Sequence, residues 1–181
     1  MNDREWDILA REEVFAAPPY VVVARERIRT GAGVIVEDFY QVALADFAVC
    51  VPQLDSGEIV TLWQYKHGPR RFGLGFPAGF IDPGETPDVA CRRELLEETG
   101  YAPGAIEELG SYVDNGNQRG SLGHYFFGRR CTVLAAPQAD DLEPIEIRLM
   151  QPAAIDAALA QGLFSVVHHV AAWALARSRI A

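Results

Sequence analysis

The clearest structural signal in the chain lies in residues 79–101, which read GFIDPGETPDVACRRELLEETGY. Pro87 suits the first position of a helix, because the N–H that proline lacks has no helical partner there. Thr86 precedes it as an N-cap residue, and Gly100 can end the helix in the left-handed conformation. These signals predict a helix over residues 87–99.

The predicted helix gathers acidic residues on one side. At about 100° per residue, Glu94, Glu97 and Glu98 share one arc. Its apolar side chains lie opposite, where we expect them to pack; they are Val89, Leu95 and Leu96. Like charges one turn apart repel, so one interpretation is a solvated helix face. The other is a site for a hard dication such as Mg²⁺, which prefers oxygen ligands, since a Gly- and Pro-rich loop leads into Glu85.

Strand patterns dominate the remaining sequence. We expect strands near residues 20–24, 34–44, 47–51, 59–65, 105–113, 123–133 and 145–150. The strands at 47–51 and 59–65 should form a hairpin, and two further helices are expected at 153–161 and 165–179. This order predicts an α+β domain with helices packed on a mixed sheet.

Composition narrows the function. With 181 residues the chain suits one domain, and a net charge of −9 argues against a nucleic-acid partner. No apolar run reaches the ~20 residues of a membrane span, and the charged start shows no signal peptide, so we expect a cytoplasmic protein without a membrane partner. The three cysteines form no CxxC pair and are expected to be small buried hydrophobes.

Gly79, Glu85 and the run from Arg93 to Tyr101 form a spaced pattern: Gly, five residues, Glu, seven residues, then RELLEETGY. All nine specified positions match, so the segment resembles the Nudix box. The resemblance implies the Nudix fold, a mixed β-sheet sandwiched between helices with an N-terminal antiparallel sheet. It also implies hydrolysis of a nucleoside diphosphate linked to another moiety. On this interpretation, residues 1–181 are a single domain with a Nudix core at 46–181.

The same resemblance assigns roles to individual residues. It implies Mg²⁺, with Mn²⁺ as a substitute, and these ligands: Glu94, Glu98, Glu97, Glu85 in support, and the carbonyl oxygen of Ala78. Arg93 would hold the glutamates by ion pairing and, with Glu97, counts among the catalytic residues. The general base is expected from the acidic segment at residues 140–146, with Glu143 first and Glu146 second. An acidic surface loop is the alternative interpretation of that segment.

Residues 62–68 and 75–79 resemble the approach to the box in ADP-ribose and other nucleoside-diphosphate-sugar pyrophosphatases. This implies a nucleotide-sugar substrate, and a homodimer to which the strands of residues 1–45 contribute. Two positions depart from those relatives: Gly75 stands where many have an acidic residue, and Lys66 where arginine is common.

The expected substrate contacts are Arg70, Arg71, Lys66 and Arg119 to phosphate or ribose, and Tyr40 to the base. Solvated arginines and a core tyrosine are the alternatives. His168 and His169 on the last helix are expected to be an exposed or half-buried pair. Two other functions stay open: hydrolysis of dinucleotides or nucleoside triphosphates, and a non-catalytic Nudix domain that senses a ligand.

Overall fold

The computed structural model describes residues 5–138 and 144–180. The chain divides into two compact units. One consists of Met1–Asp46 with Val113–Leu122, and the other of Phe47–Tyr112 with Gly123–Ala181. Each unit is described by itself.

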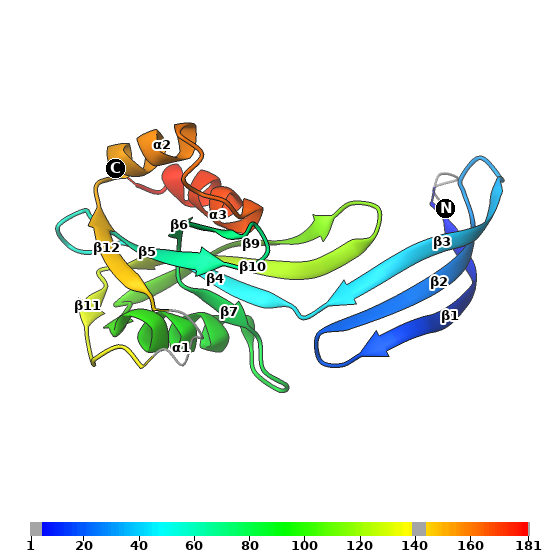
Figure 1. Cartoon of the computed structure of the whole chain (residues 1–181), viewed down its shortest axis with the longest axis horizontal. Helices are drawn as coiled ribbons and strands as arrows, with labels where there is room; N and C mark the ends of the chain where they lie inside the picture. Colours follow the sequence, from blue (N-terminus) through cyan, green and yellow to red (C-terminus); the bar gives the residue numbers. More distant parts are fainter. Residues whose placement is uncertain (1–4, 139–143, 181) are drawn as a thin grey trace. The chain divides into compact units, whose positions relative to one another are not determined.

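The first unit is built on an antiparallel sheet (Figure 1). Its strands are β1 (Asp7–Ala17), β2 (Val21–Arg29) and β3 (Ile35–Leu44). β2 pairs with both neighbours, and the start of β10 adds Arg119 and Gly120 in parallel beside β3. The sheet has little core of its own, because β1 is mostly exposed along its whole length.

The second unit contains two main sheets. In one, β10 (Arg119–Arg129) pairs in parallel with β4 (Phe47–Pro52), and β4 pairs antiparallel with β7 (Ala78–Phe80). The strand β9 (Ala105–Asn115) also pairs with β10. In the other, β5 (Ile59–Lys66) lies between β12 (Glu146–Met150) and β6 (Arg71–Gly75). The short strands β8 (Tyr101–Ala102) and β11 (Thr132–Val133) pair with each other.

The expected hairpin of residues 47–51 and 59–65 is wrong beyond its turn. Leu54 and Glu58 close the turn by a backbone hydrogen bond of 2.9 Å, and Gln53 forms an isolated bridge with Ile59. Beyond the bridge the two strands part, β4 to β10 and β7, and β5 to β6 and β12. Each strand finds a partner that is distant in sequence, a choice that local turn signals do not encode.

The core of the second unit lies on both faces of the β4–β10 sheet. One face carries Phe47, Val49 and Val51 of β4, which pack in a cluster with Trp173 of α3 (Val167–Arg177). The other face carries Ala48 and Cys50, which pack in a second cluster with α1 (Pro87–Thr99). This alternation of successive side chains places the sheet between helices, with α1 on one side and α3 on the other (Figure 1).

The helices agree closely with the sequence analysis. α1 spans residues 87–99 as predicted, and α2 (Pro152–Ala160) and α3 begin and end within two residues of expectation. Among the described residues no helix combines the length and apolarity that a membrane span requires. The predicted α+β architecture, a mixed sheet between helices, is confirmed.

Candidate active site

Helix α1 begins and ends where the sequence predicts, but only its C-terminal end has a capping hydrogen bond among those described. Thr86 has the extended backbone of an N-cap, but its hydroxyl donates to the Asp88 carboxylate at 2.7 Å and makes no cap to a backbone N–H. Gly100 takes the left-handed conformation with φ 74° and donates its N–H to the carbonyl of Leu96. The helix therefore stops just after Glu97 and Glu98 and leaves both on its last turn.

The buried stripe of α1 differs in part from the projection. Ala90, Cys91 and Leu95 are buried as small or apolar residues against β4, but Val89 is 50% exposed. The expectation that Val89 packs inward is therefore wrong, because the small residues of β4 bring the neighbouring stripe of the helix closest. Glu98 takes part in the buried stripe, with 7% of its surface exposed.

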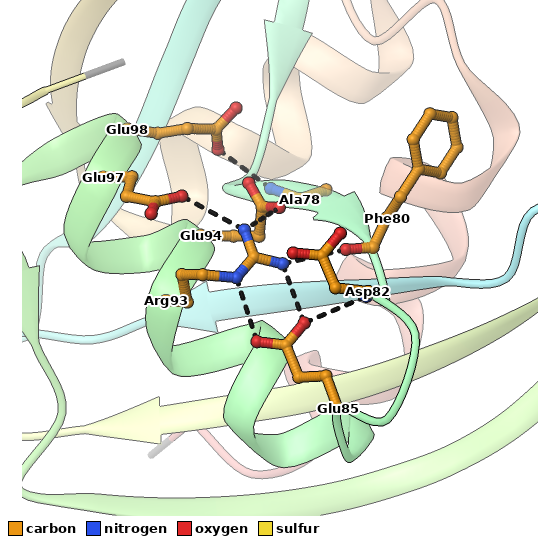
Figure 2. A network of polar contacts seen from close by, with 8 residues as sticks. All are labelled: Ala78, Phe80, Asp82, Glu85, Arg93, Glu94, Glu97 and Glu98. Atoms are coloured by element: carbon orange, nitrogen blue, oxygen red, sulfur yellow. Dashed lines mark hydrogen bonds and ion pairs between the residues drawn. The ribbon is translucent and has the colours of Figure 1, made fainter. Parts of the chain in front are cut away.

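Arg93 lies at the centre of the acidic cluster (Figure 2). Its Nε and Nη2 donate to the two carboxylate oxygens of Glu85, each at 2.9 Å. Its Nη1 donates to Glu94 at 2.6 Å and to Glu97 at 3.1 Å, and Nη2 also reaches the carbonyl of Phe80 at 2.9 Å. One guanidinium thus holds three carboxylates and the loop before the helix in a fixed arrangement, which its planar fork of donors allows.

Glu98 is held by the backbone at the start of β7. Its Oε2 accepts the backbone N–H of Ala78 at 2.9 Å (Figure 2). The structure therefore brings Ala78 to the acidic cluster through its N–H, which donates to a carboxylate. The expected metal-binding role of its carbonyl oxygen stays a prediction.

Gly79 allows Glu94 to approach the same strand, β7. A Cβ at this position would lie 2.1 Å from the Glu94 carboxylate, closer than any real contact. Gly79 does not have a positive φ, so its backbone angle does not require glycine; a side chain at this position would instead displace the Glu94 carboxylate. The Nudix-box glycine and the Glu94 carboxylate are therefore packed directly against each other.

Electrostatics in the cluster favour the charged forms. Hydrogen bonds from Arg93 lower the pKa of Glu85, and the bonds that Arg93 makes to Glu85 and Glu94 raise its own pKa. Both groups therefore stay ionised at neutral pH. The guanidinium of Arg93, whose side chain is 28% exposed, balances part of the negative charge of the cluster.

The donors of this cluster suit a hard divalent cation, because they are carboxylate oxygens close to one another. Within residues 5–138 and 144–180, no three His, Cys, Asp or Glu side chains stand in a ready metal-binding arrangement. In this structure the positive charge between Glu85, Glu94 and Glu97 is that of Arg93. The carboxylate oxygens of the cluster are thus suitable ligands for a dication, and the guanidinium of Arg93 pairs with those of Glu85, Glu94 and Glu97.

Of the two candidates for the general base, the structure describes Glu146. Glu143 lies outside the described residues. Glu146 begins β12, and its carboxylate accepts two hydrogen bonds from Arg148, at 2.8 and 3.1 Å, which lower its pKa. Arg148 in turn lies over the ring of Trp63, 4.4 Å from its centroid.

The expected phosphate contacts of the second unit share one hairpin. Lys66 ends β5 and pairs with Arg71 at the start of β6, and Arg70 turns the chain between them with φ 54°. Arg71 donates to the carbonyl of Gly162 at 3.2 Å, and Arg70 is exposed.

The other two predicted substrate contacts belong to the first unit. Tyr40 lies on β3 and is 45% exposed. Arg119 lies 3.5 Å from the Asp46 carboxylate and has φ 68°.

The sequence analysis missed the burial of His169 and its contact with Phe76. His169 is 2% exposed, so the expectation of an exposed or half-buried pair is wrong for this member. Its Nδ1 accepts the N–H of Phe76 at 3.2 Å, two residues before Ala78, whose N–H donates to Glu98. Burial, and then the charges of His168 and Lys66, hold its pKa well below the usual 6.5. The spacing of His169, Ala172, Trp173 and Ala176 marks a buried helical stripe and could have revealed it.

Residues 78–98 lie within a longer segment that matches a known family. The family model of the NUDIX domain matches residues 45–170. The chain therefore belongs to the Nudix family, which confirms the resemblance carried by residues 79–101.

Several curated relatives have names that refer to ADP compounds. The chain is 28% identical over 94 residues to the ADP-ribose pyrophosphatase of Bacillus subtilis (strain 168), which covers 51% of each protein. It is 46% identical over 43 residues to the ADP-sugar pyrophosphatase of Mus musculus, 24% of this chain and 20% of that protein. The matches thus span about half or less of these relatives' lengths.

A solved structure supports the fold over nearly the whole chain. The crystal structure of an ADP compounds hydrolase superposes with a TM-score of 0.81 and covers 97% of this chain and 94% of its own. At 22% sequence identity this similarity establishes the fold alone.

Proposed function

We propose that this chain is a Mg²⁺-dependent pyrophosphohydrolase that cleaves a nucleoside diphosphate sugar into a nucleoside monophosphate and a sugar phosphate. The observation that carries the proposal is the carboxylate cluster of α1 and the residue Glu85 before it: Glu85, Glu94 and Glu97 pair with Arg93, and Glu98 accepts the N–H of Ala78. Nudix hydrolases generally use divalent metal ions. The names of the relatives, an ADP-ribose and an ADP-sugar pyrophosphatase, support the class of substrate.

The chain's own residues divide the work. A bound Mg²⁺ would neutralise the diphosphate and lower the pKa of a water molecule. Glu94 and Glu98 would supply carboxylate oxygens, and both lie against β7, at Gly79 and Ala78 respectively. Arg93 would keep Glu85 in place through its two hydrogen bonds and prevent the cluster from spreading under its own repulsion.

Substrate contacts would come from cationic and aromatic side chains. Lys66, Arg70 and Arg71 on one hairpin would balance phosphate charge, and Lys66 would act as a point charge and not as a bidentate grip. The contacts expected from Tyr40 to the base and from Arg119 to phosphate or ribose stay predictions. In the reaction, water adds to one phosphorus, the bridging P–O bond breaks, and the proposed base Glu143 takes the proton of the water.

A substrate panel tests this proposal. The protein is incubated in Mg²⁺ with ADP-ribose, ADP-glucose and GDP-mannose in ¹⁸O-water, and products are identified by mass spectrometry. The expected result is a pair of monophosphates with the heavy oxygen on one of them. Products from none of the three, with Glu98→Gln indistinguishable from wild type, would contradict the proposal.

The same panel separates the alternatives. Adding a nucleoside triphosphate and a dinucleotide gives pyrophosphate release, or two mononucleotides, if either is the preferred substrate. Calorimetric binding of a nucleotide without any turnover would instead favour a ligand-sensing domain.

We also propose a homodimer formed through the first unit. Its support is the long exposed strand β1 and the apolar side chains that the unit leaves exposed, which include Trp6 (56%), Ile8 (61%) and Phe15 (55%). A long exposed edge strand with apolar side chains is a common pairing surface. Light scattering coupled to size exclusion should give twice the chain mass, and a monomer mass for Ile8→Lys with Phe15→Lys; a monomeric wild type would contradict the dimer.

A further inference from the structure

The chain between β6 and β7, with the first residue of β7, is held at three successive residues, Phe76 to Ala78. The N–H of Phe76 donates to Nδ1 of His169 at 3.2 Å, and the carbonyl of Pro77 accepts the N–H of Cys50 at 2.9 Å. The N–H of Ala78 then donates to the Glu98 carboxylate at 2.9 Å. The three partners come from α3, β4 and α1, so this segment is fixed from three directions. His169 supplies the one of these contacts that comes from outside the sheet and the box.

His169 and Gly75 fit each other sterically. A Cβ on Gly75 would lie 2.8 Å from Nε2 of His169, 3.0 Å from Cδ2 and 3.1 Å from Cε1. The imidazole therefore lies against the bare Cα of Gly75, in space that any other residue at position 75 would need. Gly75 does not have a positive φ, so its backbone conformation does not require glycine. The missing side chain at position 75 is explained by the ring from α3.

The same ring is fixed by packing on its other sides. Phe76 is fully buried, and its ring packs on His169 with centroids 6.2 Å apart and on Trp173 with centroids 6.0 Å apart. Since Nδ1 accepts a hydrogen bond from Phe76, it carries no proton, and burial keeps the imidazole in its neutral form. His169 therefore offers a constant acceptor in a rigid surrounding.

We infer that His169 is a positioning residue for the candidate active site. His169 fixes the N–H of Phe76, and because Ala78 lies only two residues further along the chain, this contact also keeps the N–H of Ala78 on the Glu98 carboxylate. Gly75 is the counterpart that makes room for it. The inference rests on the proposed function in that Glu98 is taken as a metal ligand. Position 75 carries glycine, where many related pyrophosphatases have an acidic residue, because the ring of His169 on the last helix takes the space of a side chain.

The first test compares two substitutions of the same side chain. In His169→Asn the amide oxygen can replace Nδ1 as the acceptor, whereas His169→Leu removes the acceptor and keeps an apolar volume. Mn²⁺ affinity is measured by electron paramagnetic resonance, and amide exchange of Phe76 and Ala78 by NMR in the metal-free protein. For His169→Leu we expect about tenfold weaker Mn²⁺ binding, typical of losing a group that orients a metal ligand, and faster exchange at both amides. His169→Asn should recover most of both.

A matched control separates positioning from stability. Trp173→Phe also loosens the packing on Phe76 from α3 but leaves the Nδ1 acceptor in place. It should lower the melting temperature while Mn²⁺ affinity stays within twofold of wild type. All measurements are made well below the lowest melting temperature, so that every variant is folded.

The steric pair gives a second, independent test. Gly75→Ala should weaken Mn²⁺ binding, because the new methyl group displaces the imidazole. Once His169 is already Ala, adding Gly75→Ala should cost nothing further, since the two positions act through the same contact. Additive losses would contradict the pairing of these residues.

The result that would overturn the inference is a folded His169→Leu protein with wild-type Mn²⁺ affinity and wild-type protection of Ala78. This outcome is distinct from failure of the proposed function. If the wild type cleaves no nucleotide sugar, the proposed activity is wrong, but Mn²⁺ binding and amide exchange still decide the role of His169. A wild type that binds no Mn²⁺ would contradict both.

Discussion

Two arginines in this protein each hold a glutamate through two hydrogen bonds, and they differ in everything around that pair. Arg93 and Glu85 have side chains that are 28% and 11% exposed, and Arg93 also holds Glu94, Glu97 and the Phe80 carbonyl. The side chains of Arg148 and Glu146 are 38% and 62% exposed, and Arg148 covers Trp63. The same chemical pair thus organises a site in one place and joins two neighbours on a strand in the other.

The difference shows what makes an ion pair consequential. Exposed pairs contribute about 0–1 kcal/mol, because water screens them and solvates either partner alone. A guanidinium shared by several half-buried carboxylates is different, since removing it leaves charges that water reaches poorly. We expect substitutions around Arg93 to affect both function and stability, and those around Arg148 to affect stability slightly.

The largest effect is expected at Glu98, the glutamate whose carboxylate accepts the N–H of Ala78 in β7. Glu98→Gln keeps the shape and an oxygen for the Ala78 N–H but removes a charge from the proposed metal site. A bound cation contributes several kcal/mol to such reactions, so we expect kcat to fall about 1,000-fold. Steady-state assays with the active nucleotide sugar measure it. Glu107→Gln, the same change in a surface ion pair, is the control and should retain activity; a comparable loss in both would point to charge and not position.

The next effect tests the comparison directly. Arg93→Lys keeps a positive charge but cannot donate to both oxygens of Glu85 at once. We expect the free energy of unfolding in metal-free buffer to fall by about 1–3 kcal/mol, because partly buried carboxylates lose their donors. Urea unfolding followed by circular dichroism measures the change. Added Mg²⁺ should restore part of the loss, and a variant as stable as wild type in the absence of metal would show that Arg93 does not organise the cluster.

The pH dependence of stability gives a smaller effect with a defined sign. Arg93 lowers the pKa of Glu85 from its ordinary 4.5. Its contribution is therefore complete above about pH 4.5 and is lost as pH falls through the lowered folded-state pKa. Wild type should lose stability on acidification in that range, and Glu85→Gln should show a shallower loss. Parallel urea titrations between about pH 3 and 7 check this, and identical slopes would remove the assigned role of the pair.

The smallest effect is expected at the exposed pair. Arg148→Lys should change the free energy of unfolding by less than about 1 kcal/mol. Tryptophan fluorescence should report the lost guanidinium over Trp63 even where stability does not change. A loss as large as that of Arg93→Lys would end the distinction between the two arginines.

The sequence predicted what local chemistry determines. The bounds of α1 followed from Pro87 and Gly100, whose effects act within a single turn. The acidic cluster followed from spacing within the same helix, and the structure brings Glu85, Glu94 and Glu97 together on Arg93. Ligand roles for these residues stay predictions.

Features that depend on distant partners were not predicted. The separation of β4 from β5 depends on β10 and β12, which lie much later in the chain. Val89 is exposed because Ala48 and Cys50 of β4 pack against a neighbouring stripe of α1, which carries Ala90, Cys91 and Leu95. The role of His169 depends on Gly75 and Phe76, and no local pattern connects the last helix to that loop.

Gly79 sets a limit on how this sequence can diverge. The space against its Cα is taken by the Glu94 carboxylate, whereas the next residue, Phe80, is 59% exposed. In a saturation library selected for turnover, codon 79 should therefore collapse to one amino acid while codon 80 accepts many. The two adjacent codons would give a direct genetic measure of how tightly a single methyl group is excluded.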